Sequence, residues 1–391
     1  MTLQEGLGMQ QIRYGLVGAG YFGSALGRAL AALPDARVTV VHDPLHAEAL
    51  ASELGARVTE STEALCSDPE VDAVIVASPN WAHVEPVILA AQNGKHIFCE
   101  KPIALGYDDC LRMVEAADRA GVLFMAGHVM NFMNGVRRAK ELIAQGAIGD
   151  VLFCRAVRNG WEEPQPEVTW KKKRELSGGH LYHHIHELDL VQSILGPATE
   201  ATMVGGNVAH RGPQFGDEDD LLVITLEFGG RAFAALEYGS AFRWPEHHVL
   251  IEGTLGAIRI DLQDVGVELR APGRRESFLL HRSEAEDRDR ARIYSDSSMD
   301  GAIMYGKPSL VPPLWLQGVI EEELSYFHGL LLGGEPLPEF AALTDGSAAT
   351  AAIATADALS LSLREGRKVR VAEITGVDGG RSRHSAGEEG R

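Results

Sequence analysis

The chain has 391 residues, of which 45% are hydrophobic and 23% are charged, and its formal net charge is −19. Such an acidic chain repels the phosphates of nucleic acid and of anionic membranes, so the charge argues against both as partners. The length is sufficient for two domains, each with its own hydrophobic core.

The cysteine pattern and the first residues predict a soluble, cytoplasmic protein. The first eleven residues have neither the basic start nor the apolar centre of a signal peptide, and no apolar run is long enough to span a bilayer. The four cysteines show no paired spacing, so we expect reduced thiols rather than disulfides. They are Cys66, Cys99, Cys110 and Cys154.

A glycine-rich turn lies within Tyr14–Leu30, where an apolar strand runs into an alanine-rich helix. Gly18 allows a tight turn, Gly20 allows the backbone to approach a pyrophosphate, and Gly23 allows the helix to pack close to the strand. The helix N-terminus would then face the phosphates. This pattern predicts a dinucleotide site, with Tyr21 and Phe22 also in the binding turn.

A second apolar run, Val38–His42, ends at Asp43, 23 positions after Gly20. An acidic side chain at this place binds the ribose hydroxyls of NAD and would repel the 2′-phosphate of NADP. The cofactor is therefore predicted to be NAD. The alternative is that Asp43 only begins a turn, because Pro44 follows it.

The first third of the chain alternates between strand and helix patterns. Strands are predicted at Asp72–Ser78, His96–Cys99 and Val122–Ala126, and helices at 84–94 and Leu111–Ala120. This alternation is typical of an α/β fold with a doubly wound parallel sheet.

After about Asp150 the pattern changes to short strands without helices between them, which predicts a mostly antiparallel sheet. One helix-like insert is predicted at His180–Leu195, and further helices over 316–331 and 346–363. Residues 281–310 read as a polar surface loop, and 375–391 as a disordered tail. The predicted strands are Val151–Val157, Ala201–Val208, Leu221–Phe228, Ala232–Tyr238, Val249–Glu252, Ala257–Asp261 and Val265–Arg270.

Several motifs together resemble the Gfo/Idh/MocA family of glucose-fructose oxidoreductase and inositol dehydrogenase. The resemblance implies an N-terminal Rossmann domain, residues 1–127, and a C-terminal α+β domain, residues 128–374, with a large open sheet. It also implies a bound NAD, hydride transfer at a secondary hydroxyl of a sugar or inositol, and a homo-oligomer, dimer or tetramer, formed through that sheet. The matching motifs are GLVGAGYFG at 15–23, Asp43, Ser78-Pro79-Asn80 with His83, Glu100-Lys101-Pro102, Gly127-His128, and His186-Glu187-Leu188-Asp189.

The resemblance implies that Lys101 and His186 act at the reacting hydroxyl. A lysine can orient the oxygen and stabilise its developing charge, and a histidine can accept its proton near neutral pH. Tyr182 stands four residues before His186, where dehydrogenases of this type commonly have an aspartate. In one continuous helix, Tyr182, His186 and Asp189 would share a face, so Tyr182 and His183 are further predicted proton-transfer groups.

The remaining predicted site residues fall into two sets, and no metal is predicted. His180 and His184 have metal-ligand spacing, but no third ligand is evident. The basic run at 171–174 is either a solvated loop or a site for an anionic substrate. The predicted cofactor contacts are Ser78, Pro79, Asn80, His83, Glu100 and Lys101; the predicted substrate contacts are His128, Asn131, Asp189, Lys171, Lys172, Lys173 and Arg174.

Two reactions fit these residues. One is the net oxidation of a sugar hydroxyl by NAD. The other is an NAD-dependent glycosidase, in which a transient ketone acidifies the neighbouring C–H, the leaving group is eliminated, water adds, and the hydride returns. An anionic sugar, such as a uronate or a sulfonated glycoside, would suit the basic run. A third alternative is a non-catalytic relative that binds NAD(P) as a sensor.

Overall fold

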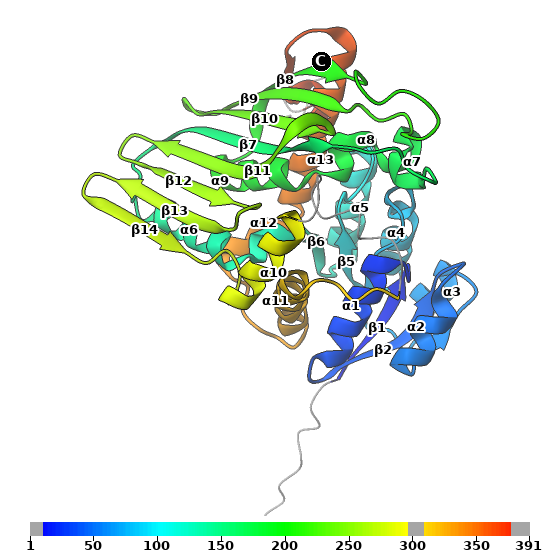
Figure 1. Ribbon diagram of the computed structural model, residues 1–391. Helices are drawn as coiled ribbons and strands as arrows, with labels where there is room; N and C mark the ends of the chain where they lie inside the picture. Colours follow the sequence, from blue (N-terminus) through cyan, green and yellow to red (C-terminus); the bar gives the residue numbers. More distant parts are fainter. Residues whose placement is uncertain (1–10, 296–308, 377–391) are drawn as a thin grey trace, which may run out of the picture.

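The computed structural model describes residues 11–295 and 309–376, which form two sheets with their helices (Figure 1). The first sheet is fully parallel in the order β3-β2-β1-β4-β5-β6. This order confirms the predicted doubly wound Rossmann arrangement, in which ligands bind at the carboxyl ends of the strands. The strands are β1 (Ile12–Val17), β2 (Ala36–His42), β3 (Arg57–Val58), β4 (Ala73–Val76), β5 (His96–Glu100) and β6 (Phe124–Gly127).

The parallel strands are connected mainly by helices, as a parallel sheet requires. Strand β4 is buried at every residue, which is the pattern of a strand covered on both faces. The connecting elements are α1 (Tyr21–Ala32), α2 (Ala47–Leu54), α3 (Thr62–Ser67), η1 (Asn80–Ala82), α4 (Val84–Gln92) and α5 (Tyr107–Ala120).

The second sheet has nine strands in the order β14-β13-β12-β11-β7-β10-β9-β8-β15. Among the described strand pairs of this second sheet, only β10 and β7 are parallel. The sheet is therefore mostly antiparallel, as predicted. The strands are β7 (Val151–Trp161), β8 (Ala198–Gly206), β9 (Leu221–Phe228), β10 (Phe233–Gly239), β11 (Ala241–Gly253), β12 (Ala257–Asp261), β13 (Gly266–Ala271), β14 (Arg274–Phe278) and β15 (Val369–Arg370).

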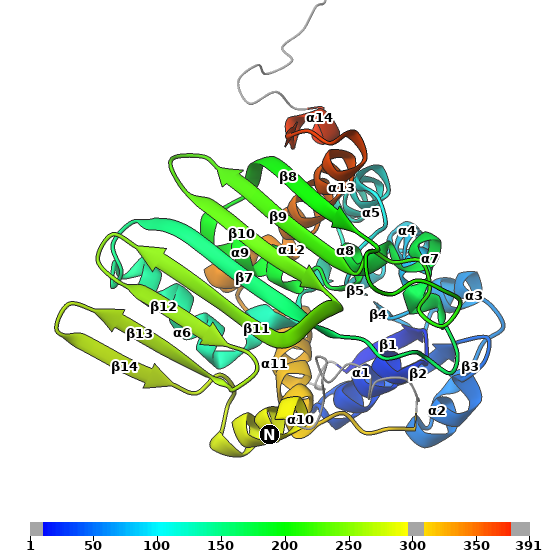
Figure 2. The same ribbon diagram turned by 45° about the horizontal axis from the view of Figure 1, so that its top comes forward.

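Helices lie along one face of this sheet (Figures 1 and 2). Strand β9 alternates between buried and more exposed residues, as expected of a sheet with one covered face. The helices and short turns of this part are η2 (Val129–Phe132), α6 (Asn134–Ala144), η3 (Trp170–Lys172), α7 (Arg174–Ser177), α8 (Gly179–His183), α9 (His186–Leu195), α12 (Ala341–Thr344), α13 (Ser347–Glu365) and α14 (Ala372–Thr375).

A late helix, α11 (Leu314–Leu331), returns to the Rossmann domain and completes its core. His328 Nδ1 lies 2.8 Å from the hydroxyl of Tyr14 on β1, and its Nε2 lies 2.9 Å from the carbonyl oxygen of Pro34. The rings of Phe327 and Phe98 pack edge to face at 5.7 Å. The N-terminal core therefore includes residues far beyond the predicted boundary at 127.

The predicted loop at 281–310 is wrong for its first half, because Glu284–Ser295 forms helix α10. Its buried side is polar, and for that reason the hydrophobic pattern did not reveal it. Asp287 accepts bonds from the backbone and ring of His281 at 2.9 and 2.8 Å, and Arg290 donates to the carbonyl of Leu262 at 2.7 Å. Residues 296–308 and 377–391, including most of the predicted tail, lie outside the described residues.

The predicted helix at His180–Leu195 is broken into α8 and α9, with a turn at His184 and Ile185 between them. Tyr182 is therefore not on the same helical face as His186. Its hydroxyl donates a hydrogen bond to Asp357 of α13, which also accepts a bond from the backbone of Tyr107. This placement argues against the prediction that Tyr182 is a proton-transfer group. Its hydrogen bond links α8 to α13.

No helix in the ranges 11–295 and 309–376 combines the length and the apolar character that a membrane span needs.

We predict that Tyr182→Phe lowers stability and preserves turnover. Removing a hydrogen bond to a partly buried carboxyl group should cost about 1.5–3 kcal/mol in the free energy of unfolding. Chemical denaturation and steady-state kinetics measure the two effects. Tyr326→Phe is the matched control, since its hydroxyl only accepts a bond from the backbone of Leu337. A kcat reduced 100-fold in the Tyr182 variant would return this residue to the catalytic set.

Candidate active site

The glycine turn has the geometry that a dinucleotide requires. Gly18 has a φ of +97°, and a Cβ there would lie 2.6 Å from the backbone of Ala77. A Cβ at Gly23 would lie 2.0 Å from the carbonyl oxygen of Gly18, so only glycine permits this packing of α1 on β1. A Cβ at Gly20 would meet nothing within 4 Å. The turn is therefore open on the side where the pyrophosphate of NAD would approach the N-terminus of α1.

Asp43 has a double role at the end of β2. One carboxylate oxygen accepts a bond from the backbone of Ala19 at 2.8 Å, and the other accepts bonds from Leu45 and His46, also at 2.8 Å. The carboxylate thus begins the turn, as the alternative interpretation held, and also supports the glycine loop. Each carboxylate oxygen has two acceptor positions, so the oxygen that faces Ala19 retains capacity for a ribose hydroxyl.

The predicted cofactor segment at 78–83 is bonded mainly to the protein itself. The ring of His83 lies between the carbonyl oxygens of Ser78 and Pro102, at 2.8 and 2.9 Å. Asn80 donates to the carbonyl of Ser177 at 2.8 Å. The side chains of His83 and Asn80 therefore position the loop after β4, and their contact with the cofactor stays a prediction. The Lys101–Pro102 peptide bond beside this loop is cis.

Lys101 lies directly after β5 and reaches the broken helix of the second domain. Its Nζ donates to the carbonyl oxygen of His183 at 3.1 Å. Burial lowers the pKa of Lys101 below its ordinary value, and the neighbouring Glu100 opposes this effect. Burial likewise raises the pKa of Glu100. A lysine with a lowered pKa can both orient a hydroxyl oxygen and exchange a proton with it.

Three histidines near Lys101 have ring nitrogens that are enclosed by the protein. In the described part of the chain, His183 Nδ1, His186 Nδ1 and both ring nitrogens of His128 have no hydrogen-bond partner, although these atoms are buried. Burial, followed by the charge of Lys101, lowers the pKa of His183 and of His186. Neutral imidazoles in this position can accept protons at ordinary pH.

Asn131 and Asp189 lie behind His128. Asn131 donates to a carboxylate oxygen of Asp189 at 2.9 Å and accepts a bond from Lys140 at 2.6 Å. The same carboxylate oxygen is 3.7 Å from His128 Nδ1. Asn131 and Asp189 are only 2% and 3% exposed and lie behind His128, which is itself 1% exposed, so the substrate contacts of these three residues stay predictions.

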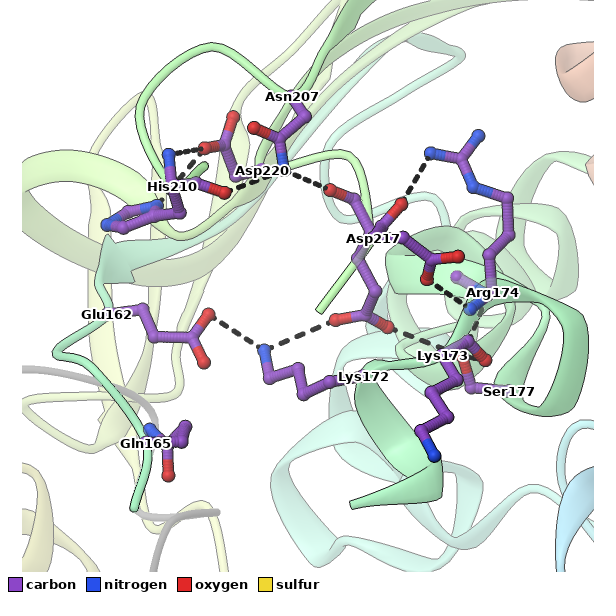
Figure 3. A network of polar contacts seen from close by, with 12 residues as sticks. Glu162, Gln165, Lys172, Lys173, Arg174, Ser177, Asn207, His210, Asp217 and Asp220 are labelled. Atoms are coloured by element: carbon purple, nitrogen blue, oxygen red, sulfur yellow. Dashed lines mark hydrogen bonds and ion pairs between the residues drawn. The ribbon is translucent and has the colours of Figure 1, made fainter. Parts of the chain in front are cut away.

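Two of the four basic residues at 171–174 pair with carboxylates within the protein (Figure 3). Lys172 lies between Glu162 at 2.9 Å and Glu218 at 3.2 Å. Arg174 pairs with Asp219 at 2.9 Å, and its backbone N–H donates to Asp217. The run holds the chain segment at 162–178 against the segment at 207–220. Lys173 and Arg174 remain exposed, and the anion site at this run stays a prediction.

These contacts between the two segments place Trp170 and Lys171 beside the histidines. The ring of Trp170 packs edge to face on Trp81 of η1 at 5.2 Å and lies 6.1 Å from the ring of His183. The charge of Lys171 contributes to the lowered pKa of Lys101 and of His183, after larger effects that include burial. Lys171 and Lys172 are thus the residues of the run whose charges act on the site, whereas Lys173 is exposed.

A group of buried ionisable residues was not predicted from the sequence. Arg158 of β7 pairs with Glu187 of α9 at 3.3 Å, and His247 of β11 bonds the same oxygen of Glu187 at 2.7 Å. Glu323 of α11 is fully buried beside Glu100, and burial raises its pKa well above the ordinary value. Two signals were present: Arg158 continues the alternation of Cys154 and Ala156, and Glu323 interrupts the apolar stripe of α11.

The histidine-rich turn does not form a metal centre in the described ranges. No three histidine, cysteine, aspartate or glutamate side chains gather there as ligands for an ion. The rings of His180 and His184 pack on one another at 4.5 Å, and burial, assisted by Lys172, lowers the pKa of His180 to about 3.

Known proteins resemble this chain along nearly its whole length. A 2,7-anhydro-N-acetylneuraminate hydratase of Mediterraneibacter gnavus is 55% identical over 94% of this chain and 99% of the relative. A protein of the same description from Escherichia coli K12 is 53% identical over 93% of this chain and 98% of its own length. Among solved structures, a levoglucosan dehydrogenase in complex with NADH and levoglucosan superposes with a TM-score of 0.74 at 24% identity, covering 93% and 100% of the two chains. That likeness shows the fold alone.

Two family models cover the two domains. The NAD-binding Rossmann-fold model of the oxidoreductase family matches residues 12–128, and its C-terminal alpha/beta model matches residues 140–371. With the glycine turn, Lys101 and the histidines arranged as described, the chain belongs to the Gfo/Idh/MocA oxidoreductase family.

Proposed function

We propose that this protein is a redox-neutral, NAD-dependent hydratase of 2,7-anhydro-N-acetylneuraminate. The observation that carries this proposal is the identity of 53–55% to two hydratases of this description over almost their entire lengths. Identity of this extent spans both the cofactor domain and the histidine-bearing domain. It favours the glycosidase-type cycle over net oxidation.

The chemistry of such a sugar fits the cycle. The bridge to be opened begins at C2, so a ketone at C4 would acidify the C–H at C3 between them. Loss of that proton breaks the C2–O7 bond and leaves a conjugated enone. Water then supplies a hydroxyl to C2, a proton returns to C3, and reduction of the ketone restores the C4 hydroxyl. The net change is the addition of one water.

Bound NAD would supply the acceptor and later the donor of the hydride, next to the glycine turn and Asp43. Lys101 would orient the C4 oxygen, and its ammonium would stabilise negative charge on that oxygen in both the oxidation and the enolate step. His186 would accept the hydroxyl proton. His183 and His128 would accept the proton from C3 and donate a proton to the departing O7. This cycle requires more proton transfers than a simple oxidation, and three histidines near Lys101 would serve them.

Net dehydrogenation is the second candidate function. A scyllo-inositol 2-dehydrogenase of Bacillus subtilis is 29% identical over 58% of this chain. This lower and partial identity makes dehydrogenation the weaker candidate.

Assembly through the nine-stranded sheet is part of the proposal. The uncovered face bears exposed apolar side chains at Leu152, Val204, Val223 and Phe233, which a second copy would cover. We also propose that the enzyme works in the cytoplasm, in keeping with its unpaired, buried cysteines.

Purified protein with a catalytic amount of NAD should convert 2,7-anhydro-N-acetylneuraminate into N-acetylneuraminate. In D₂O the product should carry deuterium at C3, because the proton at that carbon is removed and replaced. NMR follows both outcomes, and absorbance at 340 nm follows NADH. Accumulation of NADH in equal amount to an oxidised sugar, without N-acetylneuraminate, would contradict the proposal and favour the dehydrogenase.

Lys101→Met and His186→Ala should each reduce kcat by on the order of 100-fold or more, while binding of NAD is retained. The physical reason is the loss of a positioned acid–base group at the reacting oxygen. Kinetics and calorimetric titration with NAD separate the two effects. Lys368→Met is the control, because this lysine pairs with Glu200 and Glu227 far along the chain. A near-normal kcat in either variant would show that the residue does not act as an acid or base at the reacting oxygen.

The pH profile should reflect the lowered histidine pKa values. Burial and nearby cations favour the neutral imidazoles. The value of kcat/KM should therefore fall only at pH values below the ordinary histidine pKa of about 6.5. Lys171→Gln removes one of these cations and should move the acidic limb of the profile to higher pH. The same profile for Lys173→Gln is the control. If the acidic limb of Lys171→Gln lies at the same pH as that of the wild type, the charge of Lys171 does not act on the catalytic base.

A further inference from the structure

Lys140 is a partly buried cation on helix α6, behind the predicted reacting groups. Its Nζ donates a hydrogen bond to Oδ1 of Asn131 at 2.6 Å. Burial lowers the pKa of Lys140, and the charges of Asp189 and Glu339 oppose this effect. The ammonium group is therefore bonded to an amide and is attracted to a carboxylate that lies beyond that amide.

Asn131 of η2 connects Lys140 to that carboxylate. Its Nδ2 donates to Oδ2 of Asp189 at 2.9 Å and to the carbonyl oxygen of His128 at 3.1 Å. Rotation of the amide by 180° would turn its NH₂ group toward the ammonium and its oxygen toward the carboxylate, so that repulsion would replace attraction on both sides. Lys140 thus fixes the direction in which the amide of Asn131 points.

Asp189 of α9 in turn faces the ring of His128. Its Oδ2 lies 3.7 Å from Nδ1 of His128, and both residues are almost fully buried. A carboxylate on this side of an imidazole favours the tautomer with the proton on Nδ1, which leaves the lone pair of Nε2 to accept a proton. Burial lowers the pKa of His128; Asp189 opposes this effect, and Lys101 adds to it.

We propose that Lys140 is a positioning residue that acts on His128 through Asn131 and Asp189, so that Nε2 of His128 is the base that removes the proton from C3. This inference rests on the proposed function and deepens it, because it gives His186 the proton of the C4 hydroxyl and His128 the proton of C3. In the elimination, the C3–H electron pair becomes the C2=C3 double bond. The C2–O7 pair leaves with O7, which His183 protonates.

Lys140→Met should slow the elimination and spare the oxidation at C4. In single turnovers of the NAD-bound protein, the absorbance of NADH should rise within about twofold of the wild-type rate, whereas formation of N-acetylneuraminate and deuterium incorporation at C3 should be slower by on the order of 10-fold. Lys140→Arg keeps a cation and should recover most of this loss. Arg138→Met is the matched control, since Arg138 lies on the same helix and pairs with Glu141 at the surface.

A double variant tests whether the effect passes through Asn131. Asn131→Leu should slow the elimination as Lys140→Met does, and the two substitutions together should be no slower than Asn131→Leu alone, because both act through one chain of contacts. Chemical denaturation of each variant verifies that it is folded. Losses that multiply in the double variant, or an equal loss in the oxidation and the elimination, would overturn the role of Lys140.

A measurement without substrate separates this inference from the proposed function. If the wild type does not convert the anhydro sugar, the proposed function fails, and the inference is then judged on His128 itself. Nitrogen-15 spectra of the histidine-labelled, NAD-bound protein report the tautomer of His128, whose signals are those that His128→Gln lacks. A proton on Nδ1 in the wild type and mixed tautomers in Lys140→Met would support the chain of contacts. A proton on Nε2 in the wild type, or the same tautomer in both proteins, would refute it.

Discussion

The site depends on the contact between Lys101 and the carbonyl oxygen of His183. Lys101 is fixed in the parallel sheet at the end of β5, and His183 ends the short helix α8 of the second domain. One hydrogen bond thus places the predicted reacting lysine of one domain against the histidine turn of the other. Asn80 and Ser177 make a second such link, and Trp81 and Trp170 a third. The break between α8 and α9 gives the turn that exposes His183 and His186 to the lysine.

Gathering positive charge in a buried site requires fixed negative charge nearby. The chain as a whole has a net charge of −19, yet Lys101, Arg158, Lys171 and Lys172 all act on the histidine turn. Glu187 stabilises Arg158, and Glu162 and Glu218 stabilise Lys172. The result is a cluster in which burial and nearby cations favour neutral imidazoles. Under the proposed function, the charge of Lys101 would also stabilise the enolate.

The sequence predicted the parts of the site that depend on local backbone geometry. The glycine turn, the strand that ends at Asp43 and the Glu100-Lys101-Pro102 segment all lie where the predicted elements place them. Residues whose roles depend on distant partners were assigned less well. Tyr182 bonds Asp357, 175 positions away, and His83, Asn80, Asn131 and Asp189 contact protein groups from other elements.

By itself, the sequence determined the Rossmann fold and the class of cofactor, because short-range periodicity and tight turns encode them. The roles of the lysine and the histidines stay predictions from the family resemblance. Only the tertiary structure decided which charges face the site. The basic run at 171–174 looked like an anion site, and distant carboxylates pair with two of its four basic residues. Arg158 looked like an ordinary strand residue until β7, β11 and α9 brought it beside Glu187 and His247. The physical reason is that electrostatic effects depend on distance and burial in three dimensions, and neither quantity follows from the spacing of residues along the chain.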